Sequence, residues 1–257
     1  MSLLFVEASG GVTTLVINRP EKRNAFNHEM WVQLSDLVDQ ATEDDKTKVL
    51  VLRSSDQRAF SAGADISELR QMHGDPTRMA TYNQDVRKAE NTLAGCPKPT
   101  IAMISGFCVG GGCAIAVACD FRFADSTSTF GITPAKLGIV YSLVGTKRLV
   151  DLVGPTNAKL LLMSGNLLDA ERSQSIGLLT ELCDPSHLIE TTYAFAKTVA
   201  SRAQLTVRSA KSIVDMILKG AHSETDESRT LQERALASDD YREGVEAFLE
   251  GRTPRFT

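Results

Sequence analysis

Four glycines fall within seven residues of this chain, at Gly106, Gly110, Gly111 and Gly112. They separate an apolar run at 100–104 from a small-residue run at 113–118, which predicts a junction between a buried strand and a buried helix. Glycines at a helix start leave backbone N–H groups unshielded, where the helix dipole favours an anion or a developing oxyanion. Tight helix–strand packing also demands small residues, so this cluster alone leaves both interpretations open.

The cluster lacks the spacing of two common glycine motifs. No G-x-G-x-x-G is present, which argues against a dinucleotide fingerprint, and no Gly-Lys-Ser/Thr follows, which argues against a P-loop. A second small-residue segment, 60–66, follows the predicted strand 48–53. Two free N–H donors from separate strand ends would form a two-pronged oxyanion hole, and this favours the functional interpretation.

Hydrophobic periodicity divides the chain into a strand-rich first part and a helical last part. Strands are predicted at 12–17, 48–53, 100–104 and 121–125, with helices after Asn27 and after Asp75-Pro76. Strand–helix–strand spacing favours parallel pairing and an α/β core. Beyond residue 140 we expect helices at 144–153, 156–163, 169–176, 188–203, 206–218 and 224–249.

Composition excludes several classes of protein. The chain has 257 residues, a net charge of −4 and few aromatic residues, with no basic stripe, so nucleic acid is not an expected partner. No apolar run suits a membrane span, and the N-terminus does not have the pattern of a signal peptide. Five cysteines without a C-x-x-C pair predict buried thiols in a reducing compartment, hence a cytoplasmic protein without a metal site.

The order of short motifs along the chain is similar to that of a known family. Ser61-Ala62-Gly63-Ala64-Asp65-Ile66, Gly110-Gly111-Gly112, Phe130-Gly131 and Lys136-Leu137-Gly138 resemble the enoyl-CoA hydratase/isomerase (crotonase) superfamily. The resemblance extends from Asn18-Arg19-Pro20 to the tail at 239–248. It therefore covers nearly the whole chain, and the combination is far more specific than any single motif.

This resemblance implies a fold and a site. The implied fold is an α/β, crotonase-like spiral of ββα repeats over 1–195, followed by a helical C-terminal trimerisation region over 196–257. The implied assembly is a homotrimer or a dimer of trimers, and the implied substrate is an acyl-CoA thioester, with no separate cofactor. The N–H groups of Ala64 and Gly111 would form the oxyanion hole. The implied CoA-binding residues are Lys22, Arg23, Ala62, Ala64, Asp65 and Ile66.

Two positions depart from the hydratase pattern. Hydratases of the family carry one glutamate after the glycine cluster and another just after Phe-Gly, where this chain has Ala114 and Pro134. General acid–base catalysis requires a titratable group within hydrogen-bond reach of the reacting atoms, and neither residue supplies one. Ordinary hydration is therefore disfavoured, as is isomerisation through a carboxylate at the second position.

The segment 133–145 resembles a different branch of the superfamily, the methylmalonyl-CoA decarboxylases, with its T-P-x-x-L-G-x-x-Y-x-L-V-G run. The match implies that Thr133 and Tyr141 face the substrate carboxylate. Decarboxylases of that branch carry Glu at the position of Ala114 and another residue at Ala64, so the match is incomplete. Loss of CO2 from a malonyl-type thioester requires no base, only enolate stabilisation and an oriented carboxylate, which agrees with the residues that remain.

Alternatives remain open for the reaction and for single residues. The chain can be an enoyl-CoA hydratase or isomerase with a non-standard base such as Glu68, or a CoA-binding pseudoenzyme. Tyr141 can be a core aromatic and Thr133 a helix cap, while Ser142 is predicted as a cap. Glu68, Lys22 and Arg23 can be solvated surface residues. The apolar residues expected either at an acyl pocket or in the core are Leu69, Met72 and Met79.

Overall fold

The computed structural model describes residues 2–256, and its larger sheet has the strand order β1-β2-β3-β5-β7-β10. Its strands are β1 (Leu4–Ser9), β2 (Val12–Ile17), β3 (Val49–Ser54), β5 (Thr100–Ile104), β7 (Phe121–Asp125) and β10 (Glu181–Cys183). The pair β1–β2 is antiparallel and every other pair is parallel. The parallel α/β core expected from the strand–helix–strand spacing is confirmed.

Strand β3 shows why this sheet forms. Its apolar residues alternate between two separate clusters, because successive side chains of a strand point to opposite faces. Leu50 and Leu52 belong to the cluster shared with α1, α3 and α4, whereas Val49 and Val51 pack with α7 on the other face. A continuous apolar run is typical of a parallel strand covered on both faces.

A second, smaller sheet has the order β4-β6-β8-β9. Its strands are β4 (Ala59–Ser61), β6 (Phe107–Val109), β8 (Thr129–Gly131) and β9 (Leu168–Asp169). The first three run parallel to one another, and β9 pairs antiparallel with β8. Strands of two or three residues give no periodic signal, and the sequence analysis did not predict them.

Two helices begin at the predicted residues, since Asn27 caps α1 (His28–Glu43) and Asp75 caps α3 (Pro76–Ala94). Ser142 caps α5 (Leu143–Ser164), as predicted, and this element contains a non-helical residue at Gly154, between the two helices expected there. The remaining elements of the body are α2 (Ile66–Gln71), α4 (Gly111–Ala118), α6 (Ala170–Ser175), α7 (Leu188–Ala200), and the 3-10 turns η1 (Pro20–Lys22) and η2 (Pro134–Lys136).

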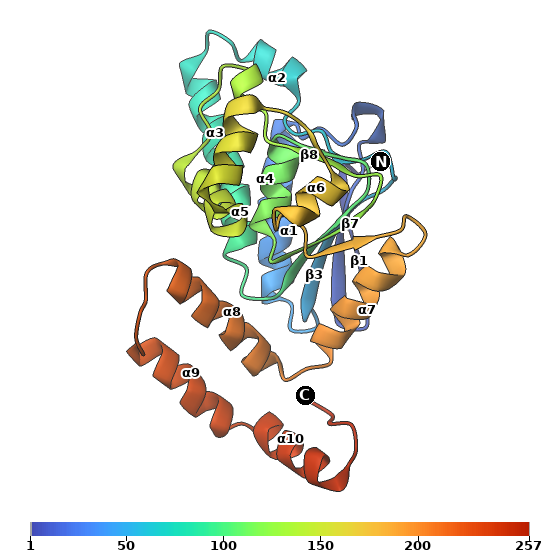
Figure 1. Ribbon diagram of the computed structural model, residues 1–257, viewed down its shortest axis with the longest axis vertical. Coiled ribbons are helices and arrows are strands. Elements are labelled where there is room, and N and C mark those ends of the chain that lie inside the picture. The colour runs from blue at the N-terminus through green and yellow to red at the C-terminus, as the bar shows by residue number, and fades with distance from the viewer. Residues whose placement is uncertain (1, 257) are drawn as a thin grey trace.

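The last three helices extend away from this body (Figure 1). They are α8 (Gln204–Leu218), α9 (Asp226–Leu236) and α10 (Asp239–Glu250). The prediction of a single helix over 224–249 is wrong. The chain forms two helices there, because the Ser238 side chain accepts a hydrogen bond from Tyr241 N and caps a new helix. The expected domain boundary at 195/196 falls inside α7, which packs on the larger sheet. Among the described residues, no helix has the length and apolar character needed to cross a bilayer.

Candidate functional site

The candidate site lies at the carboxyl edge of the smaller sheet. Strands β4, β6 and β8 are parallel neighbours, so their carboxyl ends share one edge. Ala64 follows the end of β4, Gly111 follows β6 and Thr133 follows β8, each within three residues. The sheet therefore brings together three predicted site residues that are up to 69 positions apart in the sequence (133 − 64).

The backbone N–H group of Ala64 is directed away from its strand partner. Phe26 donates its N–H to Gly63 O at 2.7 Å and accepts from Asp65 N at 2.8 Å, which makes a parallel bridge opposite Ala64. In such a bridge the facing residue turns its own N–H and C=O to the other side. A methyl group placed on Gly111 would lie 3.6 Å from Ala64 N, so the two donors are neighbours.

Gly111 is the first residue of α4, and its N–H therefore has no intrahelical acceptor. Both Ala64 and Gly111 are partly exposed, whereas Gly63 and Gly112 beside them are buried. Two accessible N–H donors from separate loops, one of them at a helix N-terminus, suit an oxygen that gains negative charge. This is the arrangement that the sequence predicts.

The glycines also meet strict packing demands. A Cβ atom on Gly112 would lie 2.4 Å from the Ser61 carbonyl oxygen, so α4 approaches β4 as closely as a glycine allows. Gly63 has φ +96, and a Cβ atom there would lie 2.8 Å from Val109 O. Packing and function are thus not alternatives here, because the close approach of the two backbones brings the two donors together.

Buried aromatic side chains pack against the two loops that carry the oxyanion donors. The Trp31 ring lies 3.1 Å from where a Cβ atom of Gly111 would be, and it packs on Phe26 with ring centroids 4.6 Å apart. Its indole N–H donates to the Tyr82 hydroxyl at 3.0 Å. Trp31 and Tyr82 are buried supports within the helices predicted after Asn27 and Asp75-Pro76, and helical spacing gives no sign of what a helix face contacts.

The basic loop at 19–25 lies against the Ala62–Asp65 segment. Ala62 N donates to Arg23 O at 2.9 Å, which fixes the loop beside the oxyanion strand. Lys22 and Arg23 are exposed, and the Arg23 guanidinium lies 5.4 Å from the Phe107 ring centroid. Arg19 differs from them, since its guanidinium donates to Ala25 O and to the Asp65 carboxylate and is not free for a phosphate.

The Asp65 carboxylate has a structural task. It accepts hydrogen bonds from Ser67 at the start of α2 and pairs with Arg19 at 2.8 Å. The Ser67 hydroxyl, followed by Arg19, lowers the pKa of Asp65 to about 2 against the opposing effect of burial. The backbone of Asp65 is bonded as well, since its N–H donates to Phe26 O and its carbonyl accepts from Glu68 N and Leu69 N, so Asp65 holds this segment in place. The neighbouring Ile66 is half-exposed and lines a shallow depression with Ser67, Arg70 and Gln71.

The two predicted hydroxyl groups, of Thr133 and Tyr141, form no side-chain hydrogen bond with any residue between 2 and 256. Thr133 precedes η2 without capping it, so the cap interpretation is wrong, and the residue is partly exposed. The Tyr141 ring packs against the core. Burial, and after it the negative charge of Glu90, raise the pKa of the Tyr141 hydroxyl well above its ordinary value. The ring is a core aromatic, yet no described residue satisfies its hydroxyl.

The positions that lack the hydratase glutamates hold no replacement carboxylate. Ala114 lies buried in the first turns of α4, and Pro134 begins η2. The carboxylate of Glu68 accepts from His28 N at 2.7 Å, so it stabilises the start of α1 and is not a free surface group. Leu69 and Met79 pack partly exposed against the core, while Met72 is buried within it.

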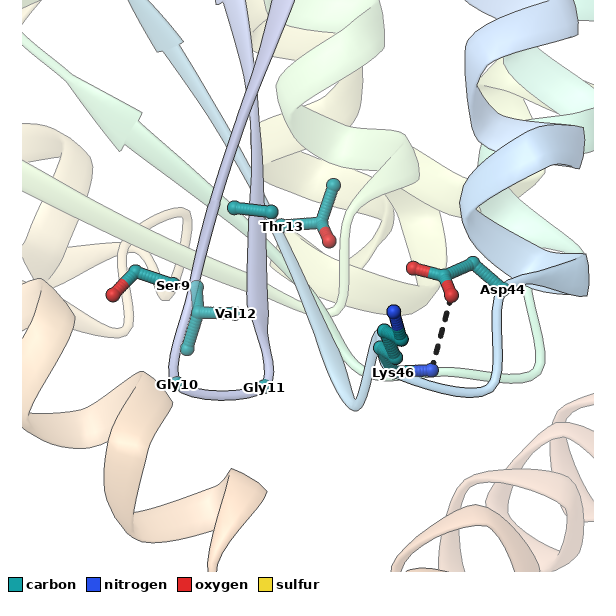
Figure 2. Close-up of a pocket in the computed structure, with 8 residues that line it drawn as sticks. Ser9, Gly10, Gly11, Val12, Thr13, Asp44 and Lys46 are labelled. Carbon is teal, nitrogen blue, oxygen red and sulfur yellow. Dashed lines mark hydrogen bonds between the residues drawn. The ribbon is translucent and has the colours of Figure 1, made fainter.

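A surface pocket at the opposite edge of the larger sheet does not belong to this site. It is lined by Ala8, Ser9, Gly10, Gly11, Val12, Thr13, Asp44 and Lys46, and Figure 2 shows it between the β1–β2 turn and the loop after α1. Gly11 precedes the amino end of β2, whereas the loops of the candidate site follow carboxyl ends of strands. In open α/β sheets, ligands bind outside the carboxyl ends.

Comparison with known proteins agrees with this geometry. The family model for enoyl-CoA hydratase/isomerase matches residues 7–257, and the chain belongs to this family. It is 32% identical to a crotonyl-CoA hydratase of Syntrophomonas wolfei, with 98% of this chain and 97% of the relative covered. It is 31% identical to the 2,3-dehydroadipyl-CoA hydratase of Escherichia coli, over 100% and 99% of the two chains.

A solved structure shows the same fold. An enoyl-CoA hydratase/isomerase family protein from Hyphomonas neptunium superposes with a TM-score of 0.96 at 34% identity, covering 100% of this chain and 98% of that one. The crotonase-like α/β fold is therefore confirmed. The two curated relatives named above are hydratases, so the similarity to methylmalonyl-CoA decarboxylases still rests on the segment 133–145.

Proposed function

We propose that this protein decarboxylates a malonyl-type acyl-CoA thioester by stabilising the resulting enolate between the N–H groups of Ala64 and Gly111. The observation that carries the proposal is the chemistry around these donors. Thr133 follows β8 at the same sheet edge, the hydroxyl groups of Thr133 and Tyr141 have no hydrogen bond among the described residues, and Ala114 and Pro134 occupy the two positions of the hydratase glutamates. Such a set can hold an anion and orient a carboxylate, but it offers no base at those positions.

The reaction follows from this set of groups. The bond between the α-carbon and the carboxylate breaks, CO2 leaves, and the electron pair moves through the α-carbon to the thioester oxygen. Each N–H donor aimed at that oxygen contributes about 3 kcal/mol of transition-state stabilisation. Thr133 and Tyr141 would hold the carboxylate out of the thioester plane. Because both are neutral, they would not stabilise the ground-state carboxylate as strongly as a cation would.

The CoA moiety would lie along the loop that contains Lys22 and Arg23. Both side chains are exposed, and the Ala62–Arg23 backbone hydrogen bond holds them next to the oxyanion segment. The partly exposed backbone of Ala62 and Ala64, together with Asp65 and Ile66, borders the same edge. A few local cations are sufficient for a polyanionic ligand even though the whole chain is acidic.

Two incubations test the reaction. Methylmalonyl-CoA should release CO2, and Tyr141→Phe should lower the rate by about 100-fold, since it removes one oriented hydroxyl. Tyr193→Phe is the matched control, because the Tyr193 hydroxyl bonds Thr14 on the far face of the sheet. Absence of CO2 release with efficient hydration of crotonyl-CoA would overturn the proposal.

Hydration of an enoyl-CoA is the second candidate, and the names of the similar proteins favour it. A crotonyl-CoA hydratase is 32% identical along nearly the full chain. This reaction would need an acid–base group other than the two absent glutamates. Tight binding of CoA thioesters without turnover of either substrate would instead indicate a CoA-binding pseudoenzyme.

Membership of the family implies a homotrimer or a dimer of trimers, and the exposed apolar residues of the last helices support an assembly of this kind. Phe248 is 85% exposed and Leu249 78%, and Leu236 and Tyr241 are also exposed. Large exposed apolar residues gathered on the consecutive helices α9 and α10 suit a protein–protein interface. The molar mass in solution, measured by light scattering, tests the assembly, and a monomer at micromolar concentration would overturn it.

A further inference from the structure

Glu90 is a buried carboxyl group without a partner. It is 7% exposed, and within the described residues it has neither a hydrogen bond nor an ion pair. Burying an acid in this way is costly unless it is paired or neutral. Burial raises the pKa of Glu90 to about 7, while Arg148 and Arg87 act in the opposite direction. Groups with such properties cluster at functional sites.

Glu90 lies on the same face of α3 as a residue that supports the candidate site. Met79, Tyr82, Val86 and Glu90 are spaced by three or four residues, so they share one face of the helix. Tyr82 on this face bonds Trp31, whose ring lies against Gly111. Met79 and Val86 are partly exposed and apolar, as expected for the wall of an acyl pocket. Glu90 is the only charged member of this set of four.

The oxygen atoms of Glu90 are not sealed inside the protein. Four side-chain atoms of the described residues are fully enclosed without a hydrogen bond, namely Ser173 Oγ, Gln204 Oε1, Arg208 Nε and Ser209 Oγ. Neither oxygen of Glu90 is among them, and neither is the Tyr141 hydroxyl. Both groups are therefore largely buried and unbonded among the described residues, and each keeps some exposed surface.

The groups around Glu90 come from three neighbouring elements. Its negative charge raises the pKa of Tyr141. Cys113 of α4, two residues after Gly111, raises the pKa of Tyr141 as well. Arg87 belongs to α3, and Arg148 of α5 donates to Asn91 beside Glu90 at 2.7 Å. Two charged groups of α1 that face α3 pair with other residues of α3. His28 pairs with Asp85, and Asp36 pairs with Lys88.

We propose that Glu90 is a catalytic acid–base residue that exchanges a proton with the α-carbon of the bound thioester. In the forward step its carboxyl O–H bond breaks, the proton bonds to the α-carbon of the enolate, and Glu90 becomes a carboxylate that water reprotonates. In the reverse step the carboxylate removes an α-proton while Ala64 and Gly111 hold the oxygen. The inference rests on the enolate chemistry of the proposed function but does not require the loss of CO2.

Exchange of α-protons in D2O tests this role apart from decarboxylation. Butyryl-CoA, which cannot lose CO2, is incubated with the protein, and deuterium entry at the α-carbon is followed by NMR. The wild type should exchange, with a rate that rises through about pH 7. Glu90→Gln should lower the rate by about 100-fold or more and remove the pH dependence. Glu43→Gln is the matched control and should change nothing, since Glu43 is exposed at the end of α1 and its carboxylate has no hydrogen bond or ion pair within the described part of the chain.

Several results would overturn the inference. They are no exchange by the wild type, a flat pH profile of the wild type, or wild-type exchange in Glu90→Gln. Circular dichroism and binding of CoA check that Glu90→Gln is folded. If the variant is unfolded, the pH profile of the wild type tests the role of Glu90, since the exchange rate should rise through about pH 7. Exchange of α-protons without CO2 release from methylmalonyl-CoA would contradict the proposed decarboxylation and would still support the role of Glu90.

Discussion

The two sheets of this molecule differ in what they demand of the sequence. The larger sheet uses strands of up to six residues whose apolar side chains fill two cores, and many hydrophobic residues would serve there. The smaller sheet uses strands of two or three residues and close backbone contacts, at which single atoms matter. The scaffold thus tolerates change that the site does not, and five substitutions probe this contrast.

The largest effect is expected at Gly112. A Cβ atom there would meet the Ser61 carbonyl oxygen at 2.4 Å, so Gly112→Ala must separate α4 from β4 and move the Gly111 donor. We expect a loss of about 3 kcal/mol of unfolding free energy and loss of activity. The matched control is Gly244→Ala in α10, where the nearest atom would lie at 3.7 Å and the helix should gain stability. Thermal unfolding measures the stability of both variants, and steady-state turnover measures their activity. Equal stability and equal turnover of the two variants would refute the contrast.

A core substitution in the larger sheet should affect stability alone. Leu50 is fully buried in β3, and Leu50→Ala leaves a cavity that costs about 2–4 kcal/mol. Turnover per folded molecule should stay within about twofold, since β3 contributes no group to the oxyanion hole. Denaturant unfolding and activity at low temperature measure both quantities. A large fall in turnover without a loss of stability would contradict the division of roles.

The Asp65 carboxylate should give a smaller, pH-dependent effect. Its pKa is about 2 in the folded state, below the ordinary value of 3.8, so the ionised form stabilises the fold at neutral pH. That contribution, about 1–2 kcal/mol, should be lost as the pH falls from about 4 to 2. Unfolding free energies of the wild type and Asp65→Asn should therefore converge at low pH. A difference that stays constant from pH 7 to pH 2 would contradict the assigned ion pair and cap.

The smallest effects are expected at the exposed cations. Lys22→Ala and Arg23→Ala should each raise the KM for an acyl-CoA about two- to fivefold, since exposed charge pairs contribute little and are screened by salt. Lys46→Ala, beside the pocket at the opposite edge, is the control and should leave the KM unchanged. Steady-state kinetics at low and high salt measure the effect. A response at Lys46 equal to that at Lys22 would point to nonspecific attraction.

The sequence could predict β2, β3, β5 and β7 of the larger sheet because buried strands have apolar runs of five or six residues, whereas the edge strands β1 and β10 were not predicted. The limits of 100–104 and 121–125 agree with β5 and β7 residue for residue. The donors of the site could be found because glycine motifs are specific to the backbone conformations they permit. Strands β4, β6 and β8 could not be found, because three residues are too few to display a period. The break at Ser238 was missed because α9 and α10 continue the same helical composition.

The sequence by itself determined which groups are available: two N–H donors flanked by glycines, two hydroxyl residues, and no glutamate at position 114 or 134. The tertiary structure decided which of these groups meet. The parallel alignment of three short strands brings Ala64, Gly111 and Thr133 to one edge. It also leaves Arg19 bound to Asp65 and brings Glu90 near enough for its negative charge to raise the pKa of Tyr141, because side-chain surroundings depend on contacts between elements far apart in the chain.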